Sequence, residues 1–379
     1  MGTRNLRKTG ETQGTEDARI SSLQLFALLT IARLVPVTII FPLVWASPNV
    51  QDLWIGAVAA LPPSLVFALF VVRLGKAFPG KTIFGILLDL FGPVFGRIVG
   101  LGLLTTWFFH LIGLLRSVAE VHVSAIMTET PEVAFIGAVV AAGVYAARAG
   151  IEPVARTSEI VLIAVALFFC QLLLLPLDVA NPEHLQPILQ HGWETPILSA
   201  LNTMTYYSSF TIIGMVLPYL GRKEGAQKPV VSAVLVSGAL IVAFILMLTM
   251  VFGPLLPSLA FPAFSLARIV SVANFLERTE SLGMVVWVLS HSLECSLLVW
   301  CCSQGLAGLL GLSDGRPLII PLGFLSAALA SNFFGSGPEV HKFYQVRTIG
   351  TMLIGFHLVL VVLLLGGLIW KKARSRSES

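Results

Sequence analysis

The stretch "TIARLVPVTIIFPLVW", residues 30–45, lies inside the first long apolar segment of the chain and contains one arginine and two prolines. Arg33 and Pro36 fall near the middle of that segment, where a membrane-spanning helix tolerates a charge and a helix breaker least well. Interrupted membrane helices do occur, but their freed backbone groups must be buried in protein or line a cavity. If this segment spans a membrane, its interruption therefore predicts a site.

The composition is that of an integral membrane protein. Of the 379 residues, 56% are hydrophobic and only 12% are charged, whereas a soluble domain keeps about a quarter of its residues charged. The mean hydropathy is +0.88. The net charge of +4 needs no nucleic acid to explain it, because basic residues are enriched in the cytoplasmic loops of membrane proteins.

Ten apolar segments are each long enough to cross about 30 Å of hydrocarbon as a helix. They begin near Ser22, Asp52, Arg97, Glu132, Thr157, Trp193, Lys228, Ser281, Pro317 and Gln345. A cytoplasmic amino terminus puts 18 of the 24 lysines and arginines in cytoplasmic segments, as the positive-inside rule requires. We therefore expect an all-α integral membrane fold of about ten transmembrane helices, with both termini cytoplasmic.

The predicted spans divide into two halves of five. Residues 1–21 form a cytoplasmic tail, 22–370 the transmembrane permease-like domain, with a first repeat over 22–176 and a second over 193–370, and 371–379 a second cytoplasmic tail. Many transporters are built from such inverted repeats, whose first helices are broken. This organisation makes spans 1 and 6 counterparts.

Span 6, "TPILSALNTMTYYSSFTIIGMVLPYL", carries a run of hydroxyl side chains at the depth at which span 1 carries Pro36. The two matching positions are thus the two irregular ones, which favours a LeuT-like 5+5 inverted repeat with broken helices 1 and 6. The alternative is that prolines and hydroxyls sit in ordinary membrane helices, where neighbouring groups satisfy the freed carbonyls.

Five stretches carry a resemblance to one family. They are "ISSLQLFALL" (20–29), "FPGKTIFGIL" (78–87), "LRSVAEVHVSAIMTETP" (115–131), "GIEPVARTSEI" (150–160) and "FPAFSLARIVSVANFLERTESL" (261–282). The chain resembles the spore-germination permease-like proteins, the B subunits of nutrient germinant receptors, within the amino acid, polyamine and organocation transporter superfamily. The resemblance implies a LeuT-like fold, a bound small nutrient, and partner A and C subunits in the spore inner membrane.

The fold that the resemblance implies places a ligand at the breaks of spans 1 and 6. The half-helix after Pro36 would present unpaired N–H groups of Val37 and Thr38 and a positive dipole end, which suit a carboxylate. Span 6 would contribute Tyr206, Tyr207, Ser208 and Ser209, and Trp107 of span 3 an apolar wall. We expect an amino acid of modest size. The alternative is that the tyrosines only pack between helices.

Two charged residues lie in the inner half or middle of the bilayer, Arg33 in span 1 and Glu294 in span 8. Each lone charge would cost about 2.5 to 3.5 kcal/mol on insertion scales, so we expect Arg33 to pair with Glu294, with His291 one turn away as a proton partner. The alternative is that Arg33 extends to the cytoplasmic face and Glu294 faces a water-filled vestibule. His110, near mid-depth in span 3, is either a functional group or a neutral histidine bonded to a carbonyl.

Further charged residues lie near the ends of the spans. Arg156 and Glu159, three residues apart, predict an ion pair at the cytoplasmic mouth of span 5. Arg116 and Glu120, four apart in the outer half of span 3, predict an interfacial pair. The apolar residues of 261–282 recur at helical spacing, which predicts an amphipathic helix on the outer surface, either a structural cap or a moving gate.

The sequence contains no catalytic constellation, no phosphate-binding glycine loop and no His/Cys spacing for a metal. We therefore expect a protein that is not an enzyme and has no cofactor. Three functions remain: a receptor subunit that binds a nutrient and signals to partners, a proton-coupled amino-acid transporter, and a structural subunit that binds nothing. The resemblance favours the receptor, and the fold it implies is equally suited to the transporter.

The loop charges generate a topology prediction. A reporter fused after Ser379 should report the cytoplasm, and one inserted near Glu183 should report the outer side, because residues 177–195 contain no lysine or arginine and such loops are translocated. A cytoplasmic signal from the Glu183 insertion would exclude the ten-span arrangement.

Overall fold

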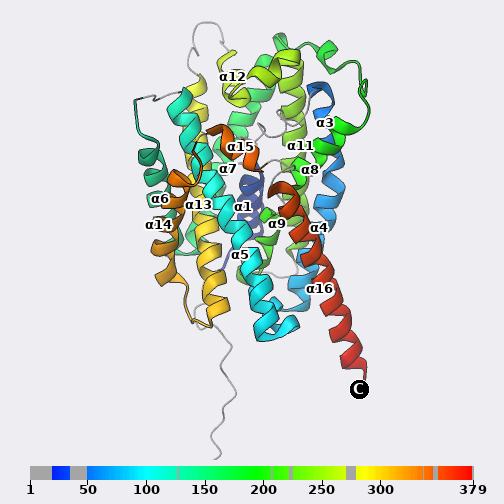
Figure 1. Ribbon diagram of the computed structural model, residues 1–379, viewed down its shortest axis with the longest axis vertical. Helices are drawn as coiled ribbons and strands as arrows, with labels where there is room; N and C mark the ends of the chain where they lie inside the picture. The colour runs from blue at the N-terminus through cyan, green and yellow to red at the C-terminus, as the bar shows by residue number, and fades with distance from the viewer. Residues whose placement is uncertain are drawn as a thin grey trace, which may run out of the picture.

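A computed structural model describes residues 19–34, 49–125, 127, 129–205, 208–221, 225–269, 279–335, 337–344 and 349–377, and most of these residues are helical. Figure 1 shows the helices side by side in one bundle, most of them running along its long axis. This agrees with the all-α membrane fold expected from the sequence. Only helices satisfy every backbone group within their own segment in hydrocarbon.

Seven helical segments are long and apolar enough to cross a membrane: Val50–Ala77, Ile83–Ser124, Glu132–Ala149, Ile151–Asp178, Gln227–Ser258, Gly283–Leu310 and Thr351–Trp370. They correspond to the predicted spans 2, 3, 4, 5, 7, 8 and 10. The helices within them are α3 (Leu53–Ala59), α4 (Leu61–Ala77), α5 (Ile83–Ala125), α6 (Glu132–Ala149), α7 (Ile151–Leu174), α11 (Gln227–Phe252), α13 (Thr279–Leu310) and α16 (Thr351–Ser377).

The other three predicted spans fall on shorter pieces. Span 1 is described as α1 (Ser22–Leu34), span 6 as α8 (Glu194–Thr205), α9 (Ser208–Thr211) and α10 (Ile213–Val216), and span 9 as α14 (Arg316–Asn332). The helical run of span 6 is interrupted at Ile212, which lies between α9 and α10. Residues 35–48 and 206–207 lie outside the described residues, so the predicted breaks at Pro36 and at the two tyrosines fall there.

A glycine shapes the start of span 3. Gly92 has φ +76° and ψ 178°, which divides α5 into a short segment before it and the membrane span after it. This left-handed conformation favours glycine, which has no Cβ. Pro93 follows, and proline is well suited to the first turn of a helix because it needs no N–H partner there. Lys81, just before the short segment, forms an ion pair with Asp89 inside it.

The described part of span 1 is at the centre of the bundle. α1 packs against α7, α11 and α13, and Figure 1 shows it inside the bundle. All its residues from Ala27 to Leu34 are buried. Thr30 and Arg33 are among them, so this helix carries its polar side chains into the protein interior rather than towards lipid.

The start of span 1 meets the end of span 6. Ile20, just before α1, donates its N–H to the carbonyl of Tyr219 at 2.9 Å and accepts from the N–H of Gly221 at 3.1 Å. The first residues of span 1 and the last of span 6 therefore share one end of the bundle, as two antiparallel counterparts of an inverted repeat would.

The opposite end carries the predicted surface helix. The described part of segment 261–282 is α12 (Pro262–Ile269), and Figure 1 places it at the end of the molecule away from the carboxy terminus. The connection between spans 5 and 6 is at the same end, since Asn181 donates its N–H to Met250 near the end of α11. Residues 270–278 lie outside the described residues.

A close approach between spans 2 and 6 generates a prediction. A Cβ added to Gly56 in α3 would lie 2.4 Å from the carbonyl oxygen of Pro196 and 2.5 Å from Cβ of Ser199 in α8. Gly56→Ala should therefore lower stability, by about 1–3 kcal/mol as overpacking does. Gly137→Ala in α6 is the matched control, because its Cβ would meet no atom within 4 Å. Thermal unfolding of both variants in detergent tests this. Equal stability of the two would contradict it.

Candidate functional site

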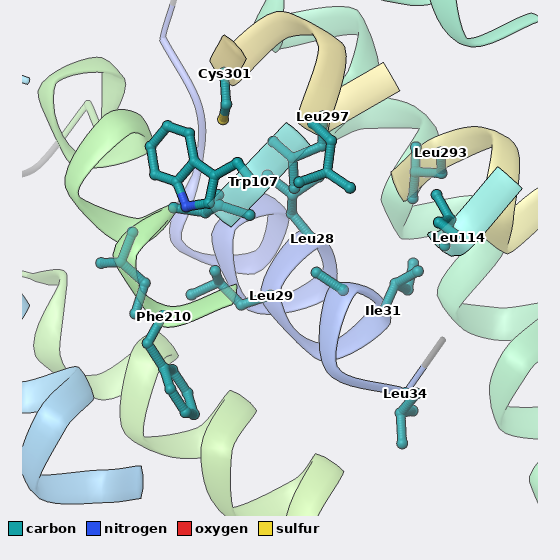
Figure 2. Packing of buried hydrophobic residues seen from close by; sticks show 14 of the residues in the cluster. Leu28, Leu29, Ile31, Leu34, Trp107, Leu114, Phe210, Leu293, Leu297 and Cys301 are labelled. Atoms are coloured by element: carbon teal, nitrogen blue, oxygen red, sulfur yellow. The ribbon is translucent and has the colours of Figure 1, made fainter. Parts of the chain in front are cut away.

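Four helices, α1, α5, α9 and α13, meet along the second half of α1. Figure 2 shows Leu28, Leu29 and Ile31 of α1 between Trp107 and Leu114 of α5 and Leu293 and Leu297 of α13, with Phe210 of α9 alongside. These apolar side chains are buried in one core. Several polar groups are embedded within it, and these define the candidate site.

Trp107 links span 3 to span 6. Its side chain is fully buried, and its indole N–H donates to the Oγ1 of Thr211 at 2.8 Å. Its ring meets that of Phe84 edge to face, with centroids 5.4 Å apart. A buried indole needs such an acceptor. Trp107 is thus fixed against the segment that the sequence assigns to the ligand site. Thr211 belongs to the hydroxyl run of span 6 but was not predicted as its partner.

Arg33 occupies the last turn of α1. Its side chain is buried, and the guanidinium lies over the ring of Phe210, 4.6 Å from the centroid. Phe210 meets Phe67 of α4 edge to face at 6.2 Å. A cation over an aromatic face is attracted by the ring quadrupole, more strongly when desolvated, and a cation is also favourable at a helix C-terminus. The alternative in which Arg33 extends to the cytoplasmic face does not agree with this burial.

Glu294 of α13 contacts His110 of α5. The Nε2 of His110 lies 3.0 Å from Oε1 of Glu294, and both side chains are buried. The sequence predicted Arg33 as the partner of Glu294, and the structure provides His110 instead. The reason lies in helix packing: α5 and α13 run alongside each other with extensive contact, whereas α1 meets α13 over a shorter stretch.

His291 lies one turn from Glu294 on α13. Its Nδ1 is 2.7 Å from the carbonyl oxygen of Trp287, four residues earlier. His122 of α5 and His357 of α16 make the same contact, with Val118 and Leu353. Contact with a backbone carbonyl was one of the two possibilities that the sequence left for His110. The structure shows this contact at His291, His122 and His357. The role of His291 as a proton partner stays a prediction.

Two predicted ion pairs have other partners. Arg156 pairs with Glu152 rather than with Glu159, because α7 already begins at Ile151 and a glutamate four residues before an arginine is well placed on a helix. Glu159 accepts a hydrogen bond from Gln24 of α1 at 3.5 Å. Arg116 is buried and forms its ion pair with Glu132 of α6, while the charge of Glu120 also acts on it. The pairing of Arg116 with Glu132 depends on which helices are neighbours, and spacing along the sequence does not show this.

The predicted ligand contacts are only partly described. Pro36, Val37, Thr38, Tyr206 and Tyr207 lie outside the described residues, and Ser208 and Ser209 are described only as the first turn of α9. Their contribution to a ligand site stays a prediction.

Two hydroxyls near the site were not predicted. Thr30 of α1 and Ser290 of α13 are buried, and neither Oγ atom has a hydrogen-bond partner among the described residues. Ser290 lines a cavity of about 40 Å³ together with Ile31, Leu34, Phe244 and Trp287. A buried polar group without a partner is costly, so both hydroxyls are available to a ligand or water.

Comparisons with known proteins identify the relatives of this chain. The profile of a family described as "Spore germination protein" matches residues 19–332. "Spore germination protein KB" of Bacillus subtilis (strain 168) is 23% identical over 372 residues, which cover 95% of this chain and 97% of that protein.

Solved transporter structures share the fold. Mhp1, a nucleobase-cation-symport-1 family transporter in a closed conformation with bromovinylhydantoin bound, superposes with a TM-score of 0.61 at 13% identity, covering 92% of this chain and 80% of that one. MhsT in complex with L-phenylalanine has a TM-score of 0.56 at 13% identity and covers 89% of both chains. These likenesses confirm the LeuT-like fold.

The contact between His110 and Glu294 generates a prediction. In a double-mutant cycle on stability, His110→Ala and Glu294→Ala should be coupled by about 0.5–3 kcal/mol, because residues in direct contact do not behave additively. The cycle of Arg33→Ala with Glu294→Ala should show the smaller coupling. Thermal unfolding in detergent measures both cycles. A larger coupling for Arg33 would restore the pairing predicted from the sequence.

Proposed function

The chain belongs to the spore germination protein family, and on this premise we propose that it is the membrane B subunit of a nutrient germinant receptor. It binds a small nutrient at the centre of the bundle and passes the signal to partner A and C subunits in the spore inner membrane. Both termini are cytoplasmic, and residues 22–176 and 193–370 form the two repeats. The multi-pass membrane character and the family are established independently of this proposal.

One observation carries the proposal: polar groups from four helices converge around the end of α1 within an apolar core. They are Arg33 over Phe210, the Trp107–Thr211 hydrogen bond, the His110–Glu294 pair, and the hydroxyls of Thr30 and Ser290. Polar and ionisable residues inside a membrane protein are costly and most often mark a ligand or ion site. A purely structural subunit would need such contacts only as links between helices, and the unpartnered hydroxyls of Thr30 and Ser290 make no such link to any described residue.

The chemistry of this region favours an amino acid. Arg33 supplies positive charge where α1 ends, and the N–H groups predicted at Val37 and Thr38 would add hydrogen-bond donors for a carboxylate. Trp107 and Phe210 provide aromatic surface for an apolar side chain. The relative MhsT is described with L-phenylalanine, which supports this class of ligand in a fold of this kind.

Transport is the second candidate function. Mhp1 is named a transporter, and the shared fold suits movement of a ligand as well as its detection. Uptake of a radiolabelled amino acid into proteoliposomes that contain this chain alone separates the two functions. Uptake driven by a proton gradient would favour a proton-coupled amino-acid transporter, and binding without uptake would favour the receptor.

The proposed ligand class gives a prediction on stability. An amino acid present at about 100 times its Kd should stabilise the purified chain by about 2.7 kcal/mol, whereas sugars and nucleosides should not. Trp107→Phe should weaken this stabilisation, because it removes the indole that positions span 6. Trp193→Phe is the matched control, since Trp193 is exposed. Thermal-shift screening measures both. Stabilisation by sugars or nucleosides and by no amino acid would refute the assignment.

A further inference from the structure

The pair of His110 and Glu294 differs from the other ion pairs. Among the ion pairs between described residues, it has both partners buried, whereas in each of the others at least one side chain is about a quarter or more exposed. It also lies in the middle portions of two long spans, α5 and α13, rather than near their ends. A surface ion pair can exchange protons with water, but this one is enclosed by protein.

The charge balance of this pair depends on one proton. With Glu294 ionised beside a neutral His110, the pair carries one negative charge in a medium of low dielectric constant, which is unfavourable. With one proton more, the pair is neutral as a carboxylic acid that donates to the imidazole. Nε2 and Oε1 are 3.0 Å apart but are not aligned for a hydrogen bond, so loading would need a small rotation of these side chains.

We propose that His110 and Glu294 form a proton-binding site at the centre of the membrane domain. In the loaded state the proton is on the carboxyl of Glu294 and is donated to Nε2 of His110. In the unloaded state the proton has left and Glu294 is a carboxylate. Loading forms one O–H bond at Glu294 and breaks one in the hydronium ion that delivers the proton. Unloading breaks the O–H bond at Glu294 and transfers the proton to a water molecule that reaches the pair, which becomes hydronium.

The charged groups around the pair influence the pH at which it loses the proton. α1, which contacts α13, contributes the buried cation Arg33. α13 itself contributes His291 and Cys295, and α5 contributes Arg116, Glu120 and His122. The helices packed against α5 and α13 carry other described charged or titratable groups. His357 and Cys170 are two of them. The rest lie nearer the helix ends, namely Glu132, Arg148, Glu152, Arg156, Glu159, Arg268, Arg316, Glu339 and Lys342.

Arg33 and Arg116 are the buried cations among the described residues of the helices that pack against α13. Arg116 is already paired with Glu132, so we assign to Arg33 the compensation of a charged Glu294. An opposite charge favours the ionised form of a carboxyl group, and burial disfavours it. Removing the positive charge of Arg33 should make Glu294 hold its proton up to a higher pH. In that case the charge of Arg33 acts on Glu294 from a distance, and the direct contact that the sequence suggests is not formed.

The proton site would also influence ligand binding, and this step rests on the proposed function. A neutral Glu294 leaves more of the positive potential of Arg33 for an incoming carboxylate, so amino-acid affinity should rise as the pH falls. By linkage, the ligand would in turn favour the loaded state. A receptor built this way responds to nutrient and proton together.

Infrared difference spectroscopy of the purified full-length chain tests the site without a ligand. At neutral pH the wild-type protein should show the carbonyl band of a protonated carboxylic acid, which shifts in heavy water and disappears as the pH rises. Glu294→Gln should lose this band, and Asp52→Asn, which alters another buried carboxyl, should keep it. A wild-type spectrum without the band overturns the proposal, and this outcome needs no variant to fold.

Two further variants test the partners. His110→Gln should keep the band at a changed position, because the hydrogen-bond acceptor has changed, whereas His357→Gln should leave it unmoved. Arg33→Gln should shift the loss of the band to higher pH. A band that persists in Glu294→Gln, or that His110→Gln leaves unmoved, would overturn the assignment.

The coupling to ligand is measured separately. The wild-type shift in melting temperature with a stabilising amino acid should grow as the pH falls, and Glu294→Gln should abolish this trend. If the infrared band behaves as expected but no amino acid stabilises the protein, the proposed ligand class fails and the proton site stands. If amino acids bind but the band is absent, the proton site fails and the proposed function stands.

Discussion

The backbone polar groups of this protein that lie within the membrane must find their partners inside the protein. Lipid offers no hydrogen bonds, so the segments long enough to span the membrane are helical. The central position of α1 agrees with this constraint. An arginine buried in such a helix is tolerated only where surrounding helices enclose it.

The same constraint makes polar contacts the specific links between helices. Apolar side chains of different helices attract each other little more than they attract lipid, so packing and hydrogen bonds must select the neighbours. The Trp107–Thr211 bond joins α5 to α9, the His110–Glu294 contact joins α5 to α13, and Arg116–Glu132 joins α5 to α6. Span 3 takes part in all three of these links.

Sequence patterns predicted the elements better than their partners. Length and hydropathy locate spans, and the apolar spacing in 261–282 indicated α12, because these signals are local. The choice of His110 over Arg33 for Glu294 depends on which helix lies beside α13 and how each is rotated, and neither is encoded in spacing along the chain. Arg156 was assigned the wrong neighbour because the start of α7 was placed too late. The ligand contacts predicted at residues 36–38 and 206–207 lie outside the described residues.

The enclosure of α1 has a consequence for how the protein can respond. Close-packed cores have discrete arrangements and do not deform continuously. Because α1 is packed on α7, α11 and α13 at once, and its last turn is held against Phe210, it cannot shift gradually without losing contacts on several sides. Any displacement of this helix would be a jump between two packed positions. Each molecule would then be in one of two packed states, and a ligand would change the fraction of molecules in each state rather than move the helix by degrees within one molecule.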